Sequence, residues 1–119
     1  MPDPLADARM WHVTVTVSGS PVTEASIRQG LERLSHEHPF LLAGRYAGDR
    51  AEIRYWDEAP NVEAAAAHAA GLWQRHRTAA ALPDWEVVGV EVVDQATFQR
   101  RGRHAAPAGL VAAGRMMPF

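Results

Sequence analysis

The chain contains neither cysteine nor lysine. Without cysteine it can form no disulfide, no thiolate zinc site and no cysteine nucleophile, and such a composition fits a reducing compartment. All twelve basic residues are arginine, which together with the many alanines is typical of a high-GC bacterium. The net charge is −2. That charge argues against general affinity for nucleic acid, because such binding needs a dense cationic surface.

Long apolar runs are missing as well. No segment approaches the roughly 18 apolar residues of a membrane span, and the opening MPDPLADARMW lacks the pattern of a signal peptide. We therefore expect a cytoplasmic protein without membrane contact. With 119 residues, 47% of them hydrophobic, the chain can form one hydrophobic core without disulfides or metal. We expect an N-terminal arm over 1–9, one domain over 10–96 and a C-terminal tail over 97–119.

The clearest local pattern is the strict alternation in MWHVTVTVSG, which predicts a strand with one buried face. Trp11, Val13, Val15 and Val17 share one face, and His12, Thr14, Thr16 and Ser18 share the other. A helix is predicted next, with Ser20 as its N-cap and Pro39 at its end. Two strands around a turn at 47–50 form a predicted hairpin.

A second helix is predicted between Asn61, as N-cap, and Pro83, and its apolar stripe runs through Val62, Ala65, Ala69, Leu72, Trp73 and Ala80. WEVVGVEVVD then reads as a fourth strand. The order β-α-β-β-α-β predicts a ferredoxin-like split βαβ fold, a four-stranded antiparallel sheet with two helices on one face. The opposite face is left for water, a ligand or a partner. We call it the open face.

The fourth strand is apolar on both sides, so its phase is ambiguous. A regular row of β-branched residues favours Val88, Val90 and Val92 toward the helices. Trp85, Val87, Glu91 and Val93 would then point to the open face. A strand with two apolar sides indicates that its outer side is covered too.

A second copy of the chain, or the tail, could cover the open face, since an apolar patch on a small domain usually has a partner. The apolar residues of the tail are Leu110, Val111, Met116, Met117 and Phe119. We therefore expect a non-enzymatic interaction or regulatory module, homodimeric through the open face or bound to another protein. Its expected interface residues are Arg54, Trp56, Trp85 and Val87.

The alternative is a small-molecule sensor or enzyme that uses His12, Glu52 and Arg54 on the same face. A concave pocket closed by the C-terminal tail would favour this alternative, and a flat apolar face would favour the dimer. A third hypothesis is nucleic-acid binding by Arg54, Trp56 and the basic residues Arg100, Arg101 and Arg103. It lacks the signature motif of RNA-binding sheets.

The remaining polar residues carry little functional signal. His36 and His38 suit the end of a helix, while His68 and His76 are too far apart in one helix to share an ion, so no metal or cofactor is expected. No nucleophile elbow, P-loop or dinucleotide motif is present. The basic cluster QRRGRH reads more simply as a solvated segment.

Overall fold

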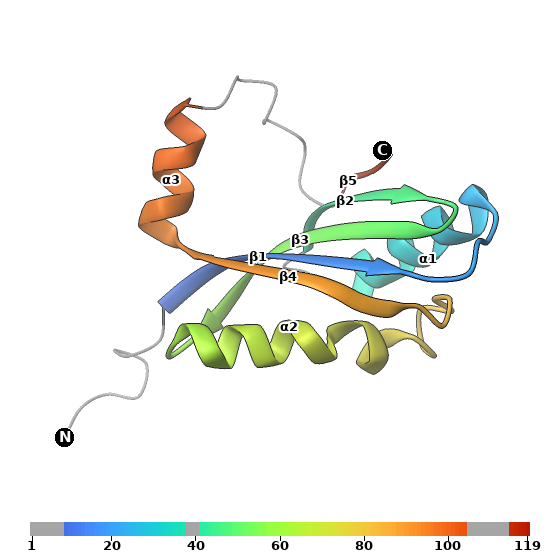
Figure 1. Cartoon of the computed structure of the whole chain (residues 1–119), viewed down its shortest axis with the longest axis horizontal. Coiled ribbons are helices and arrows are strands. Elements are labelled where there is room, and N and C mark those ends of the chain that lie inside the picture. Colours follow the sequence, from blue (N-terminus) through green and yellow to red (C-terminus); the bar gives the residue numbers. More distant parts are fainter. Residues whose placement is uncertain (1–8, 38–40, 105–114) are drawn as a thin grey trace.

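The computed structural model describes residues 9–37, 41–104 and 115–119. Its elements are β1 (Arg9–Ser18), α1 (Glu24–Glu37), β2 (Leu41–Ala47), β3 (Arg50–Ala59), α2 (Val62–His76), β4 (Glu86–Asp94), α3 (Gln95–His104) and β5 (Arg115–Pro118). They form an α+β fold around one open sheet (Figure 1). None of the helices in these ranges is long and apolar enough to cross a membrane.

The strands lie in the order β4-β1-β3-β2-β5. The pairs β4–β1, β1–β3 and β3–β2 are antiparallel, and β1 and β3 lie between the other two of these four strands, as predicted. The prediction of a four-stranded antiparallel sheet is nevertheless wrong. β5 pairs parallel with β2 and makes the sheet five-stranded and mixed.

A glycine in β2 makes room for this fifth strand. A Cβ on Gly44 would lie 2.5 Å from Sδ of Met116, so only a residue without a side chain lets the thioether pack there. Met116 is partly buried against the core. The backbone amide of Phe119 donates to the carbonyl of Tyr46 at 2.9 Å, which holds the C-terminal residue beside the sheet.

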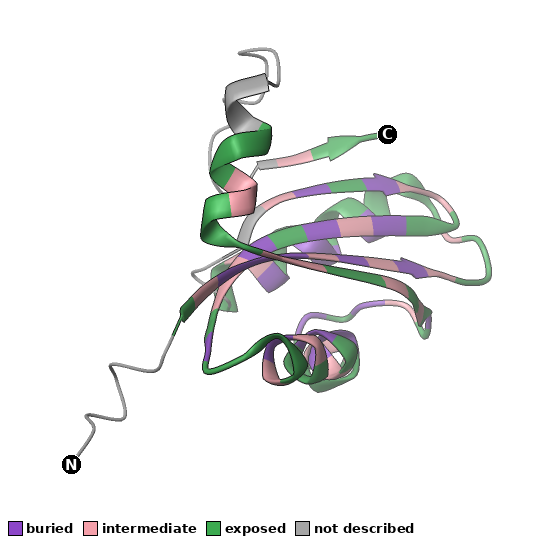
Figure 2. Cartoon of the chain, turned by 60° about the vertical axis from the view of Figure 1, so that its left-hand side comes forward, coloured by how far each residue is buried: buried purple, intermediate pink, exposed green. Residues whose placement is uncertain are grey.

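The core lies between the sheet and the helices α1 and α2. Buried and less buried residues alternate along β1 and β3 (Figure 2). Buried positions of β1, β3 and the two helices belong to one cluster: Val13, Val15, Val17, Ala51, Ile53, Tyr55, Ile27, Leu31, Leu34, Ala65, Ala69, Leu72 and Trp73. The alternation predicted for β1 is therefore confirmed.

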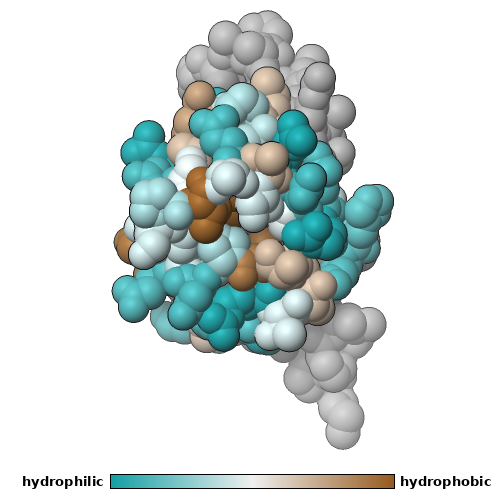
Figure 3. Space-filling view, turned by 90° about the vertical axis from the view of Figure 1, so that its right-hand side faces the viewer, coloured by the Kyte–Doolittle hydropathy of each residue, from teal (hydrophilic) through white to brown (hydrophobic). Residues whose placement is uncertain are grey.

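The end of the molecule drawn in Figure 3 is mostly hydrophilic around a small hydrophobic patch.

Each of these helices begins at a polar cap. In α2, the Asn61 side chain accepts a hydrogen bond from the amide of Ala64 at 2.8 Å, which confirms the predicted cap. In α1 the prediction is wrong, since the helix starts at Glu24 and Thr23 Oγ1 accepts from the amide of Ser26 at 3.1 Å. Ser20 lies before the helix, and its carbonyl accepts a hydrogen bond from the indole of Trp85.

A bulge in β4 divides its predicted inner face. Thr16 pairs with Gly89 and Val17 with Val87, so Val88 is the extra residue. Val88 is 60% exposed, and the prediction that it faces the core is wrong. Beyond the bulge Val90 and Val92 lie beside Val15 and Val13 on the helix side, as predicted, but Val90 is 39% exposed and only Val92 packs against the core.

The same bulge places Val87 on the helix side, where it packs against the core, contrary to the prediction. Trp85 is also misplaced by the prediction, because its ring is only 2% exposed. The ring stacks on Trp73 with centroids 6.1 Å apart, and its Nε1 donates to the carbonyl of Ser20 at 2.8 Å. Trp85 is therefore a core residue.

The segment after β4 is a helix, where an aperiodic tail was expected. Asp94 provides the cap, since its Oδ1 accepts from the amide of Thr97 at 2.6 Å. This hydrogen bond lowers the pKa of the Asp94 carboxyl. In Figure 1, α3 projects from the end of β4, apart from α1 and α2.

Candidate functional site

The strand pairing defines the residues of the open face, because residues paired across an antiparallel ladder point to the same side. β1 contributes His12, Thr14, Thr16 and Ser18, β3 contributes Arg50, Glu52, Arg54 and Trp56, β4 contributes Gly89, Glu91 and Val93, and β2 contributes Ala43 and Arg45. Most of these side chains are polar or charged. The outward placement of Glu91 and Val93 agrees with the sequence-based prediction.

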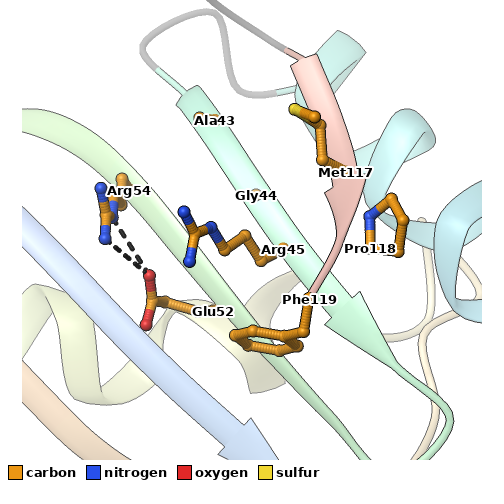
Figure 4. A pocket seen from close by; sticks show the side chains of 8 residues that line it. All are labelled: Ala43, Gly44, Arg45, Glu52, Arg54, Met117, Pro118 and Phe119. Carbon is orange, nitrogen blue, oxygen red and sulfur yellow. Dashed lines mark hydrogen bonds and ion pairs between the residues drawn. The ribbon is translucent and has the colours of Figure 1, made fainter. Parts of the chain in front are cut away.

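A pocket of about 220 Å³ lies on this face, between the strands β2 and β3 and the C-terminal segment. Its lining residues are Ala43, Gly44, Arg45, Glu52, Arg54, Met117, Pro118 and Phe119 (Figure 4). The strands β2 and β3 supply the charged floor, and the C-terminal segment supplies an apolar wall. Two regions more than sixty residues apart in the chain thus meet in one concave site.

Two arginines and one glutamate set the charge of the pocket. Both Nε and Nη2 of Arg54 contact Oε1 of Glu52, at 3.1 and 2.9 Å. Arg45 extends from the neighbouring strand toward this pair (Figure 4), but no carboxylate in the described part of the chain forms an ion pair with it. With Glu52 matched by Arg54, Arg45 is the charged side chain of the pocket that has no ion-pair partner among the described residues.

The apolar wall is held in place by contacts of Phe119, the residue that follows β5. The guanidinium carbon of Arg50 lies 5.0 Å from the ring centroid of Phe119, a cation–π contact. Phe119 remains 49% exposed and Met117 43% exposed. The wall is therefore positioned by the protein and is still accessible to a ligand.

A cluster of three aromatic rings occupies another part of the open face. Phe98 of α3 stacks on His12 with centroids 4.2 Å apart, and Trp56 meets both rings edge-on, at 5.4 Å from His12 and 4.9 Å from Phe98. We call this set the aromatic cluster. His12 lies on the predicted face, but α3 covers it and leaves it 7% exposed.

The surroundings of His12 disfavour its protonation. Burial lowers the pKa of His12 most, and the charge of Arg54 lowers it further, while Glu91 acts in the opposite direction. Arg101 of α3 also lowers it, although this guanidinium is paired with Glu91 at 3.0 Å. His12 is therefore mainly neutral at pH 7, and its ring acts as a packing surface for α3.

A family described as a domain of unknown function, DUF8830, matches residues 10–108. The chain belongs to this family. No curated protein matches the chain. The DUF8830 region spans β1 through α3, and thus the floor of the pocket and the aromatic cluster, whereas Met117 and Phe119 lie beyond it.

The structure separates the sequence-predicted residues of this DUF8830 protein into three groups. Glu52 and Arg54 line the pocket, and His12 and Trp56 belong to the aromatic cluster. Trp85 lies in the core with Val87 packed against it, so neither is on the open face. The pocket residues Arg45 and Phe119 were not predicted as a site. Alternation in the hairpin could have placed Arg45 beside Glu52, but nothing local places Phe119.

The basic residues of the predicted cluster, Arg100, Arg101 and Arg103, belong to α3. Arg100 contacts the hydroxyl of Thr97 at 3.2 Å, and Arg101 pairs with Glu91. The side chain of Arg103, like residues Leu110 and Val111, lies outside the part that the structure describes. Within that part, no group of three or more His, Asp or Glu side chains could hold a metal ion.

Proposed function

We propose that the protein is a small-molecule-binding module, a sensor rather than a catalyst, and that its site is the pocket on the open face. One observation supports this most: the C-terminal segment borders a concave pocket over charged residues of β2 and β3. Ligand sites are typically concave, with apolar walls and a few fixed polar groups. We interpret the scaffold as a ferredoxin-like split βαβ fold extended by α3 and β5.

The polar groups of the open face favour binding over catalysis. Glu52 is held in an ion pair, and the buried His12 is covered by Phe98. Neither group is free to exchange a proton with a substrate, which a general acid or base must do. Arg45, Arg54 and Phe119 instead supply contacts that orient a bound molecule.

The test is a screen of neutral, cationic and anionic fragments by NMR, with the backbone amides as reporters. Compounds that bind in the pocket are expected to shift amides of β2 and β3 around Ala43 and Glu52. Ala43→Phe should abolish these shifts, because Ala43 lines the pocket and a phenyl ring would fill it.

Ala70→Phe is the matched control. Ala70 is an exposed residue of α2, away from the pocket, and the same change there should leave fragment binding intact. If no fragment shifts the amides of the pocket, or if Ala43→Phe binds fragments as well as the wild type does, the proposed function is wrong.

A second candidate is self-association through the open face. The observation in its favour is that Met117 and Phe119 expose almost half of their surface beside the charged strands. The loss of Trp85 and Val87 from this face removes the apolar area on which the dimer hypothesis depended. The open face that remains is largely polar, which makes self-association the weaker candidate.

Light scattering after size-exclusion chromatography distinguishes the two candidates. A mass of twice 13.0 kDa that Met117→Glu halves would support self-association. Val88→Glu is the matched control, since Val88 is also exposed but lies on the edge strand β4. A monomeric wild type at all concentrations would exclude the dimer and leave the pocket free for a ligand.

A further inference from the structure

We infer that the ligand of the pocket is a small monocarboxylate with a flat apolar body, anchored by Arg45 and packed against Phe119. This inference rests on the proposed function, and it assigns the ligand class of the same site. The assignment follows from the charge, the shape and the size of the pocket.

The positive charge of Arg45, unpaired among the described residues, favours an anionic ligand in the pocket. One oxygen of Glu52 accepts a hydrogen bond from Nε of Arg54 and forms an ion-pair contact with its Nη2, so this pair is matched internally. Arg45 has no such partner within the described residues, and its side chain reaches over the same pocket (Figure 4). A planar guanidinium presents a fork of donors that fits both oxygens of a carboxylate. One unmatched positive charge suits one negative charge.

The wall selects an apolar body. Met117, Pro118 and Phe119 face the pocket from one side, with Ala43 and Gly44 beside them. The Phe119 ring is already held by Arg50, so a ligand need not fix its orientation. A flat ring can pack against that exposed aromatic surface, in the offset or edge-on arrangements that aromatic pairs prefer.

The volume limits the ligand to a small molecule. Pockets for drug-sized ligands measure about 300–1,000 Å³. The 220 Å³ found here corresponds to about seven water molecules at liquid density. A ring with one carboxylate matches this size, whereas a nucleotide or a peptide would extend far outside the pocket.

The experiment compares benzoate with benzamide, which has nearly the same shape without the charge. Binding constants are measured by NMR titration of the full chain at low salt and neutral pH. We expect benzoate to bind about tenfold more tightly than benzamide, the effect of one charge-assisted contact at a partly exposed site. Arg45→Gln should reduce benzoate to the affinity of benzamide and leave benzamide unchanged.

Arg28→Gln is the matched control, because it removes one positive charge from an exposed site on α1. It should leave benzoate binding unaltered, which separates a specific contact from the net charge of the protein. Phenyl phosphate tests the charge of the ligand, and tenfold tighter binding than benzoate would replace the monocarboxylate with a dianion.

The outcomes separate this inference from the proposed function. If benzamide binds in the pocket as well as benzoate does, or if Arg45→Gln leaves benzoate binding unchanged, the ligand class is wrong and the pocket remains a binding site. If neither these probes nor any fragment of the wider screen shifts the pocket amides, both the ligand class and the proposed function are wrong.

Discussion

Substituting Gly19 by alanine tests the unexpected placement of Trp85 in the core. The indole ring of Trp85 lies directly over Gly19, and an added Cβ would fall well inside van der Waals contact with three atoms of the ring. The ring cannot move away easily. It is buried, it stacks on Trp73, and its Nε1 donates to Ser20.

The expected loss of stability follows from two opposing effects. Forcing an extra methyl group into a packed core costs about 1–3 kcal/mol. Removing the flexibility of glycine from the unfolded chain returns about 0.4–1 kcal/mol, where the backbone conformation suits alanine. The net effect is a decrease of about 1.5 kcal/mol in the free energy of unfolding. For a chain of this length, Tm should fall by about 6 °C.

Urea unfolding followed by tryptophan fluorescence measures this change. Gly71→Ala is the matched control, since the nearest atom to its added Cβ is Nη1 of Arg75, at the end of a flexible side chain. Alanine also stabilises a helix interior by about 0.5–1 kcal/mol relative to glycine. Gly71→Ala should therefore stabilise the protein. If Gly19→Ala proved as stable as the wild type, Trp85 would not pack over Gly19 and our account of β4 would fail.

Three further predictions concern the aromatic cluster and a helix cap. Folding lowers the pKa of His12 below 6.5, so the unfolded chain binds a proton at His12 more readily than the folded chain does. The contribution of neutral His12 to the free energy of unfolding is therefore complete above pH 6.5 and is lost as the pH falls through the folded-state pKa. Urea unfolding of the wild type and His12→Gln at pH 7 and pH 5 measures this, and equal pH dependence in the two proteins would contradict it. Phe98→Ala should expose His12 and raise its pKa toward 6.5, as followed by NMR titration, whereas Phe98→Leu should preserve most of the burial; an unchanged pKa in Phe98→Ala would mean that α3 does not cover His12. Asn61→Ala should cost about 1 kcal/mol through loss of the α2 cap, and Asn61→Asp should cost much less; equal losses in urea unfolding would argue against a capping role.

Local patterns predicted most of the scaffold. The period-two alternation of β1 identified its buried face, because a sheet covered on one side imposes that period on the side chains. Asn61 marked the start of α2, since its carboxamide can bond an amide that the helix leaves unpaired. The β2–β3 hairpin followed from a short polar turn between two strands. Each of these features depends on residues close together in the chain.

α3 could also have been predicted from a local signal. Asp94 and Thr97 have the spacing of a helix cap, but the polar composition that follows hides any apolar stripe. Phe98 is the one large apolar residue of α3. It packs only because His12 and Trp56, distant in the chain, present their rings to it.

By itself, then, the sequence determined the order of the main elements and the buried faces of β1 and β3. Only the tertiary structure decided the rest, because those features depend on contacts between distant segments. β4 is apolar on both sides, so its phase changes at a bulge set by pairing with β1. Trp85 lies inward because its ring packs over Gly19 and its Nε1 donates to the carbonyl of Ser20. The pocket forms because Gly44 leaves room for Met116 where β5 pairs with β2, and the residue after β5, Phe119, lines the same pocket as Arg45. The hydrophobic periodicity of a single segment cannot predict contacts of this kind.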